Sequence, residues 1–304
     1  MKDIKIQATM QLYMHKFDRE AMNTTFDLLI TKEVDYPTAS SAAAEVFDQT
    51  ERLETLLSMY YEGSDIQMIN TAEIGVPVKL TCYACDCIMA AFAASTISGG
   101  AIDVCLAELY HTKKHPEYKM SHPPRRGKFE IDPENFYIMK TADGAIDLGC
   151  IGKGFALDVA CEYLKDVWQI ENAFGSFGAS SIFAMGVNDE NNAWEINLSE
   201  KISIELPKTQ MFIGASGTSV LGNHIIDART LESPSEQPFR TWAFCDSGAL
   251  SDAMSTAFMI MDRKSIEKAC QENEIAAAIQ KTADSEIEFI NTDALNLKII
   301  NKSI

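Results

Sequence analysis

Four short segments between residues 181 and 215 look like strands of an antiparallel sheet, with apolar and polar side chains alternating most clearly in residues 194–198 and 201–206, and they restrict the fold more than any other feature of the sequence. They are residues 181–185, 194–198, 201–206 and 211–215. A period of two places one face of each strand on a core and is typical of antiparallel sheets. Segments with apolar residues at helical spacing occur before and after this region in an irregular order. The sequence therefore predicts an α+β fold rather than a doubly wound parallel sheet.

The remaining expected elements follow from periodicity and from Gly and Pro. Strands are expected at residues 25–31, within 129–140, and at 145–148, 276–280 and 287–290; helices at 39–59, 81–95, 153–167, 250–261 and 264–273. Residues 111–128, rich in Pro, Lys and His, are expected to form a surface loop, and the small residues 175–181 a flexible one. No linker or repeat interrupts the chain, so we expect residues 1–304 to form a single domain of two intimate lobes.

The charge of the chain limits its partners. It has 304 residues with 26 Lys and Arg against 44 Asp and Glu, a net charge of −18. Nucleic acids and anionic membrane surfaces require clustered positive charge, so neither is an expected partner. The longest apolar stretch, residues 87–106, is interrupted by Ser, Gly and Asp, so no transmembrane segment is expected. The N-terminus lacks an apolar signal core, which predicts a cytoplasmic chain as written, although a trimmed exported form would look the same.

Eight cysteines are spread along the chain, and Cys82, Cys85 and Cys87 resemble half of a metal motif. No second pair follows at zinc spacing. We interpret these cysteines as small core residues in a reducing compartment rather than as a metal site or a disulfide framework.

Residues 146–158 combine an apolar segment, a glycine-rich turn and the start of a helix. Free backbone N–H groups at such a turn, with the Lys153 ammonium group, can bind a phosphate. The spacing is not that of a Walker P-loop. The alternative is an ordinary strand-to-helix turn with a solvated lysine.

Two further positions could carry chemistry. Asp252 and Thr256 are four residues apart and share one helix face, and their oxygens suit a hard cation such as Mg²⁺. Asp252 could instead cap a helix by accepting free N–H groups. His224 lies among apolar residues, where it is either an ordinary buried histidine or a general base or phosphate-contacting donor.

Taken in order, the sequence motifs resemble the ApbE family of FAD:protein FMN transferases over about residues 20–262. The similar segments are residues 22–26 (MNTTF), 51–70 with Glu51, Tyr60 and Asn70, 99–104 (GGAIDV), 146–158 (IDLGCIGKGFALD), 177–181 (FGASS), 215–230 (ASG to HIIDART) and 251–257 (SDAMSTA). The resemblance implies an α+β fold with antiparallel or mixed sheets flanked by helices and a ligand cleft between two lobes.

The resemblance also implies a function and a site. The enzyme would be a transferase that uses Mg²⁺, moves the FMN half of FAD onto a Thr or Ser hydroxyl of a target protein and releases AMP. The FAD contacts implied are Met22, Tyr60, Ala101, Ile102, Asp103, Asp147, Lys153, His224 and Ile226. The metal would be held by the Asp252 carboxylate, the Thr256 hydroxyl and the backbone carbonyl of Cys150. The catalytic candidates are Asp252 and His224, the latter as a contact to the transferring phosphate or as the base for the acceptor hydroxyl.

Several positions depart from the usual family pattern. Asn23 and Ala179 replace glycines, and residues 215–219 and 228–231 also differ. A side chain at Asn23 or a methyl group at Ala179 could narrow the cleft. The departures keep two other functions open: hydrolysis of FAD to FMN and AMP, and a catalytically weak FAD-binding protein.

Overall fold

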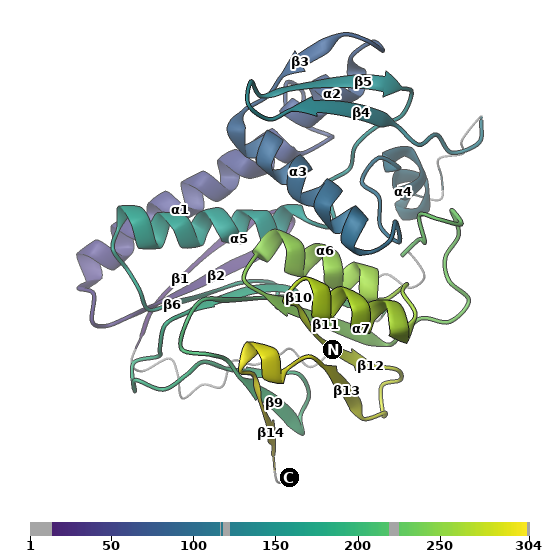
Figure 1. Ribbon diagram of the computed structural model, residues 1–304. Coiled ribbons are helices and arrows are strands. Elements are labelled where there is room, and N and C mark those ends of the chain that lie inside the picture. Colours follow the sequence, from purple (N-terminus) through teal and green to yellow (C-terminus); the bar gives the residue numbers. More distant parts are fainter. Residues whose placement is uncertain (1–13, 116, 118–121, 219–224, 303–304) are drawn as a thin grey trace.

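An eight-stranded sheet forms the centre of the computed structural model, which describes residues 14–115, 117, 122–218 and 225–302 (Figure 1). The strand order is β1-β2-β6-β7-β10-β11-β12-β13, and all of its pairings are antiparallel. The strands are β1 (Met14–Ala21), β2 (Thr24–Thr31), β6 (Ala173–Phe177), β7 (Ser181–Met185), β10 (Met211–Gly217), β11 (Arg240–Cys245), β12 (Ala276–Gln280) and β13 (Ile287–Ile290).

Two three-stranded sheets accompany the large one. The first is ordered β3-β5-β4 and the second β14-β9-β8. In Figure 1 the first lies at the top beside α2 and α3, and β9 and β14 lie below the large sheet. Their strands are β3 (Pro77–Lys79), β5 (Tyr137–Ala142), β4 (Lys128–Asp132), β14 (Lys298–Asn301), β9 (Ile202–Glu205) and β8 (Glu195–Asn197).

Helices cover one face of the large sheet and connect it to the upper small sheet (Figure 1). The described helices are α1 (Tyr36–Leu57), α2 (Asp65–Thr71), α3 (Cys82–Ile97), α4 (Ala107–Lys114), α5 (Gly152–Glu162), α6 (Gly248–Phe258) and α7 (Arg263–Glu272). A π-helical turn, Tyr163–Val167, extends α5, and a 3₁₀ turn, Asp293–Leu295, precedes β14. The predicted α+β class is confirmed. Every strand pairing among the described residues is antiparallel.

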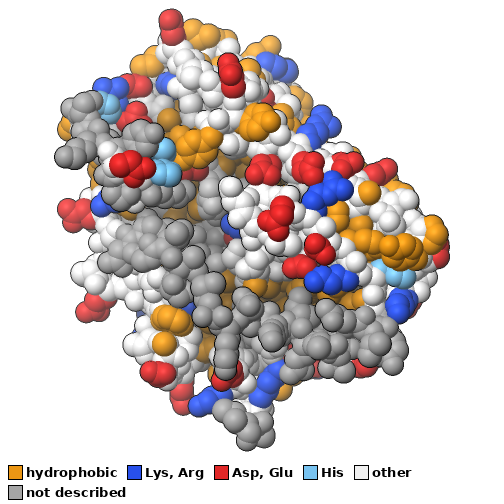
Figure 2. Space-filling view, turned by 180° about the vertical axis from the view of Figure 1, so that it is seen from behind, with side chains coloured by type: hydrophobic (Ala, Val, Ile, Leu, Met, Phe, Trp, Pro, Cys, Tyr) orange, Lys and Arg blue, Asp and Glu red, His pale blue; other side chains and the backbone are white. Residues whose placement is uncertain are grey.

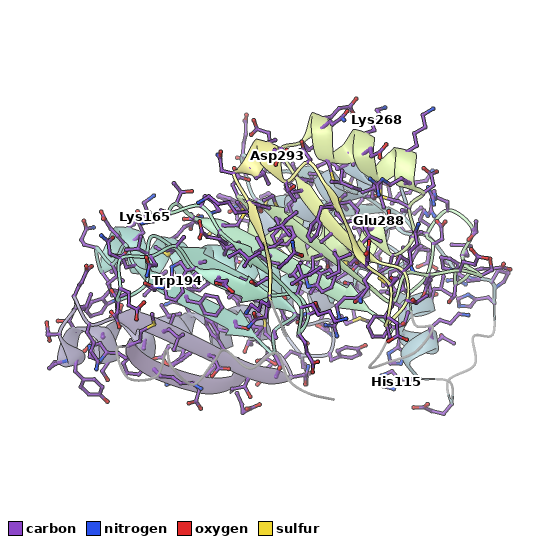
Figure 3. All side chains as sticks on the ribbon, turned by 90° about the horizontal axis from the view of Figure 1, so that it is seen from below. His115, Lys165, Trp194, Lys268, Glu288 and Asp293 are labelled. Atoms are coloured by element: carbon purple, nitrogen blue, oxygen red, sulfur yellow. The ribbon has the colours of Figure 1, made fainter. Side chains whose placement is uncertain are left out.

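The two faces of the large sheet bury different hydrophobic clusters. Phe212 of β10 packs with the helices, whereas its neighbour Ile213 packs in a second cluster with Trp194 and Trp242 on the other face. Trp194 of this second cluster is labelled in Figure 3. This division is the period of two that the sequence predicts for residues 211–215. The helix-side cluster also includes Leu80, which follows β3 of the upper small sheet. One continuous core therefore joins the large sheet to the upper small sheet.

The prediction of a flexible loop at residues 175–181 is wrong. Most of it belongs to β6 and β7, joined by a short turn at residues 178–180. Gly175 pairs with Phe183 across these strands, and a Cβ atom on Gly175 would lie 2.2 Å from the Phe183 ring. The small residue makes room for a cross-strand aromatic ring, so it supports a strand rather than a loop.

Two other predicted elements need correction. Residues 145–148 form no strand, because their backbone bonds go singly to neighbouring loops: Asp147 N–H donates to the Val104 carbonyl, and Ala107 N–H to the Ala145 carbonyl. The predicted surface loop 111–128 begins inside α4, which ends at Lys114. The segment predicted at 129–140 is the β4–β5 hairpin.

Asn23 and Ala179, which replace glycines of the usual family pattern, lie in hairpin turns whose backbone is left-handed. Met22 and Asn23 join β1 to β2 with φ values of 51° and 61°, and Ala179 in the β6–β7 turn has φ of 60°. Asparagine tolerates this region better than most residues, whereas alanine is strained there. Asn23 is exposed at the tip of its hairpin.

Ala179→Gly is expected to raise the free energy of unfolding by about 1 kcal/mol, because glycine removes the left-handed strain at this position. Gly178→Ala is the opposite case: φ is 52°, and the added Cβ would lie 2.4 Å from Thr24 Oγ1. Urea unfolding measures the free energy of unfolding of both variants, which should rise for Ala179→Gly and fall for Gly178→Ala. A destabilised Ala179→Gly variant would contradict the left-handed turn.

The prediction that the cysteines are core residues is confirmed for six of the eight, which are buried. It is wrong for Cys82, which is exposed, and Cys150 is partly exposed. All eight are free thiols. Within the described ranges, no three His, Cys, Asp or Glu side chains are grouped so as to hold a metal, and no helix is both long and apolar enough to span a bilayer. Figure 2 shows acidic side chains over one face with Lys and Arg lying singly among them. An anionic ligand therefore requires positively charged groups at its own binding site.

Candidate functional site

Helices α5 and α6 meet at glycines, and this contact places Asp252, a predicted metal ligand, beside Lys153 of the predicted phosphate-binding turn. A Cβ on Gly154 would lie 2.0 Å from the Gly248 carbonyl oxygen, and one on Gly248 would lie 2.3 Å from the Gly154 oxygen. On the other side of α6, a Cβ on Gly214 of β10 would lie 2.1 Å from the Ser251 oxygen. Only glycine permits backbones to approach this closely. The first two turns of α6 are therefore held against both α5 and the large sheet.

Asp252 is buried at this contact and receives donors from two other elements. Its Oδ2 accepts the Gly154 N–H at 3.0 Å, and its Oδ1 accepts the Ser181 hydroxyl at 2.8 Å. The Lys153 Nζ lies 3.9 Å from Oδ2. Asp252 thus caps the start of α5 rather than its own helix. Capping and a functional role coexist here, because each carboxylate oxygen keeps a lone pair for a further partner.

The turn predicted to bind a phosphate leads into the start of α5. Its cap residue, Ile151, provides no side-chain hydrogen bond. The Gly152 N–H donates to Leu148 and the Gly154 N–H to Asp252, while the Lys153 N–H between them donates to no described residue. An open N–H at a helix N-terminus beside an ammonium group favours an anion.

The three residues predicted to hold a metal fit a hard cation by their chemistry. Asp252 is a buried carboxylate, and Thr256 follows one turn later on α6. The Thr256 Oγ1 lies 3.1 Å from the Ser216 hydroxyl, so its oxygen faces the end of β10. Cys150 lies in the turn before α5, and its predicted ligand is the backbone carbonyl. Oxygen donors of these three kinds suit Mg²⁺.

Three loops bring a second group of predicted residues together. The Ala228 N–H donates to the Ala101 carbonyl at 2.9 Å, and the Asp147 N–H donates to the Val104 carbonyl at 2.9 Å. Ile226 packs with Leu106, Leu109 and Ala228 in one small cluster. The Asp147 carboxylate accepts the Gly149 N–H at 2.8 Å, so it shapes the turn that leads into α5.

The side chains in these loops differ in what they can contact. Ala101, Ile102 and Ile226 are at most 5% exposed, so a ligand would meet them through their backbone. Asp103 is partly exposed and its Oδ2 lies 3.2 Å from Arg126 Nε. Arg126 also donates to the Ala228 carbonyl. This arginine comes from the segment predicted as a surface loop, and it ties two of the site loops together.

Met22 and Tyr60 are held by contacts with other elements. The Met22 N–H donates to Glu54 of α1 at 2.8 Å, which fixes the β1–β2 turn. Tyr60 is 62% exposed, and its hydroxyl lies 3.2 Å from His111 Nδ1. Partial burial, and to a lesser extent the Asp147 carboxylate, raise the pKa of Tyr60. His224 lies outside the described residues, so its role stays a prediction.

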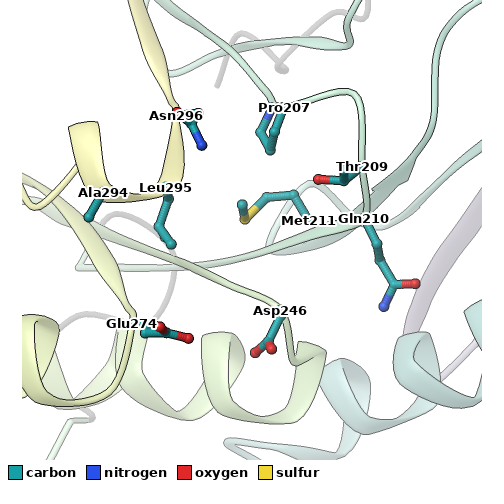
Figure 4. Close-up of a pocket in the computed structure, with 9 residues that line it drawn as sticks. All are labelled: Pro207, Thr209, Gln210, Met211, Asp246, Glu274, Ala294, Leu295 and Asn296. Carbon is teal, nitrogen blue, oxygen red and sulfur yellow. The ribbon is translucent and has the colours of Figure 1, made fainter.

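A separate pocket of about 230 Å³ contains none of these residues (Figure 4). It is lined by Pro207, Thr209, Gln210, Met211, Asp246, Glu274, Ala294, Leu295 and Asn296. Two carboxylates, on Asp246 and Glu274, face a small space there. The pocket offers no local positive charge for a phosphate ligand.

The sequence reasoning missed several residues that shape the site. Ser181 and Ser216 bond to the predicted metal ligands, and Asn70 binds both backbone groups of Ile146 with its side-chain amide at 2.8 and 2.9 Å. All three lie within the segments that resemble the family. Their contacts join residues 40 to 76 positions apart, so periodicity or local spacing could not have assigned them.

Residues 22–279 match the ApbE family. The chain belongs to the ApbE family. A FAD:protein FMN transferase from Vibrio cholerae serotype O1 is 22% identical over 299 residues, with 89% of each chain covered. The ApbE match includes every predicted site residue.

Solved structures of family members share this fold. The flavin transferase ApbE from Vibrio cholerae gives a TM-score of 0.78 at 19% identity, covering 91% of this chain and 96% of that one. The apo form of the Pseudomonas stutzeri flavinyl transferase ApbE gives 0.80 at 20% identity, covering 93% and 97%. The ApbE protein from Thermotoga maritima gives 0.77 at 21% identity, covering 93% and 98%. These matches confirm the predicted ApbE-like fold.

Proposed function

We propose that this ApbE-family chain is a transferase that moves the FMN half of FAD onto a hydroxyl of a target protein. The observation that carries the proposal is the junction of α5 and α6. There the Lys153 ammonium group, an open backbone N–H and the Asp252 carboxylate lie at one helix start. This combination suits the pyrophosphate of FAD in a chain whose overall charge is strongly negative.

The reaction requires one bond to form and one to break. The oxygen of a Thr or Ser hydroxyl attacks the phosphorus of the FMN half, and the bond from that phosphorus to the bridging oxygen breaks, so AMP leaves. The hydroxyl proton must pass to a base, for which His224 is the candidate. Lys153 would hold the pyrophosphate by charge, and its open backbone N–H at the start of α5 would orient it.

Mg²⁺ is part of this proposal. The Asp252 carboxylate, the Thr256 hydroxyl and the Cys150 carbonyl would hold it. When bound, the metal would polarise the phosphorus and neutralise the charge that develops on the leaving AMP. Ser181 and Gly154 would orient the Asp252 carboxylate, because each donates to one of its oxygens.

A denaturing gel tests the transfer. The purified chain is incubated with FAD, Mg²⁺ and a solubilised protein extract of the producing organism, and the gel is read by flavin fluorescence. Only a covalently attached flavin survives denaturation. A fluorescent band that requires the chain and disappears with a metal chelator supports the proposal. AMP and free FMN without any band would show FAD hydrolysis instead, and FAD binding without AMP would show a binding protein.

Lys153→Ala is expected to weaken FAD binding about tenfold while leaving riboflavin binding unchanged, because only FAD has a pyrophosphate for the ammonium group to meet. Flavin fluorescence titrations with both ligands measure the difference. Lys165→Ala is the matched control, since Lys165 is exposed on the turn that extends α5. Equal weakening of both flavins by Lys153→Ala would separate this lysine from the pyrophosphate.

A further inference from the structure

The Asp158 carboxylate makes no hydrogen bond to those described residues that are predicted to bind FAD or Mg²⁺, yet it is partly buried where α5 crosses α6. It lies one turn after Gly154 on α5. Its Oδ1 accepts the Gly248 N–H at 2.5 Å and its Oδ2 accepts the Ala249 N–H at 2.8 Å. The Ser247 hydroxyl lies 3.4 Å from Oδ2. All of its hydrogen bonds therefore go to the first turn of α6.

These contacts complete the capping of α6. The first N–H groups of a helix have no partner within the helix. Here Gly248 and Ala249 donate to Asp158, and Leu250 donates to the Ser247 side chain at 3.2 Å. The next residue, Ser251, makes the first ordinary helical bond, to the Ser247 carbonyl. Asp158 thus satisfies two of the three N–H groups that would otherwise be free.

The capping is reciprocal. Asp252 of α6 accepts an N–H from the first turn of α5, and Asp158 of α5 accepts two from the first turn of α6. The Gly154–Gly248 contact lies between these two carboxylates. A shift of α6 along its axis would break both sets of bonds together. The position of Asp252 next to Lys153 therefore depends on Asp158.

The chemistry at this position favours a carboxylate over a neutral cap. Burial raises the pKa of Asp158 to about 6, and the Ala249 and Gly248 N–H groups lower it only in part. At neutral pH the group is still mainly ionised, so both oxygens accept and the negative charge meets the positive end of α6. An asparagine would present one acceptor oxygen and turn an NH₂ group toward the second N–H.

We propose that Asp158 is a positioning residue that holds the first turn of α6, and through it the Asp252 and Thr256 side chains, in register with the start of α5. The inference rests on the proposed function for its catalytic consequence only. Its structural part, the clamp on α6, can be measured in the free protein.

Hydrogen exchange of the free protein tests the clamp. In Asp158→Asn, the amides of Gly248 and Ala249 are expected to exchange roughly five- to tenfold faster. Amides of β10 and β12 should be unchanged. Glu162→Gln is the matched control, because it removes an exposed carboxylate one turn later on α5. Unchanged exchange at residues 248–249 in Asp158→Asn would overturn the inference, whatever the activity.

Kinetics test the consequence for the site. Asp158→Asn is expected to lower kcat for FMN transfer roughly 10- to 100-fold, with a much smaller change in KM for FAD. Raising the Mg²⁺ concentration should restore part of the loss, which a general loss of stability would not allow. Urea unfolding verifies that the variant is folded in the assay. An active wild type with an equally active Asp158→Asn would reject the positioning role, whereas an inactive wild type would reject the proposed function.

Discussion

Asp252→Asn is expected to reduce FMN transfer by roughly 100-fold or more, because it removes the one carboxylate at the predicted metal site. The amide keeps an oxygen for one of the two present donors, the Gly154 N–H and the Ser181 hydroxyl. The free energy of unfolding should therefore fall by no more than about 1–3 kcal/mol. Transfer rates over a range of Mg²⁺ concentrations, combined with urea unfolding, separate the two effects.

Asp246→Asn is the control for this experiment. Asp246 is an exposed carboxylate just before α6 and lines the separate pocket, so its loss should leave transfer unchanged. A second variant, Ser181→Ala, leaves the Asp252 charge in place but removes one of its donors, and an intermediate loss is expected. If Asp252→Asn retained full activity with an unchanged dependence on Mg²⁺, the metal would be held elsewhere.

Gly154→Ala is expected to have the largest effect on stability of any single methyl group in the site. The added Cβ would lie 2.0 Å from the Gly248 oxygen and 2.7 Å from the Asp252 Cβ. Both neighbours belong to α6, which also packs against β10. The steric overlap can therefore be removed only if α5 and α6 move apart. The cost is about 3 kcal/mol or more, at the upper end for overpacking. For a protein of this size we expect a fall in Tm of about 6 °C or more.

Gly152→Ala tests whether that effect comes from the contact or from helix propensity. Gly152 is two residues earlier in the first turn of α5, and nothing lies within 4 Å of its added Cβ. Alanine should be tolerated or slightly stabilising there, by up to about 1 kcal/mol. Differential scanning calorimetry of both variants compares them directly. Equal Tm values for the two would mean that the helices do not meet at these glycines.

Local patterns in the sequence predicted much of the fold. The apolar segments 181–185 and 211–215 were predicted as strands at the right places, and the apolar spacing at 39–59 predicted α1 to within a few residues. The β6 strand was mistaken for a loop because Gly175 and Ser176 have low strand propensity by themselves. Its strand character comes from Phe183, a partner whose ring needs the space above Gly175.

The candidate site was predicted only in part, and the reason is geometric. Spacing within one helix placed Asp252 and Thr256 on one face, and the glycine-rich turn marked Lys153. The contacts that give these residues their setting join distant parts of the chain: Gly154 to Asp252, Ser181 to Asp252, and Asp158 to Gly248. They depend on how α5 crosses α6, which no local pattern specifies. The family resemblance supplied the remaining residues.

The ratio of covalently bound FMN to released AMP tests the central claim most directly. The chain is incubated with FAD, Mg²⁺ and the solubilised extract, protein is precipitated with acid, and both products are quantified after subtraction of an Asp252→Asn reaction. Transfer to a protein hydroxyl predicts one FMN in the precipitate for each AMP in solution. AMP accompanied only by free FMN, or no AMP at all, would contradict it.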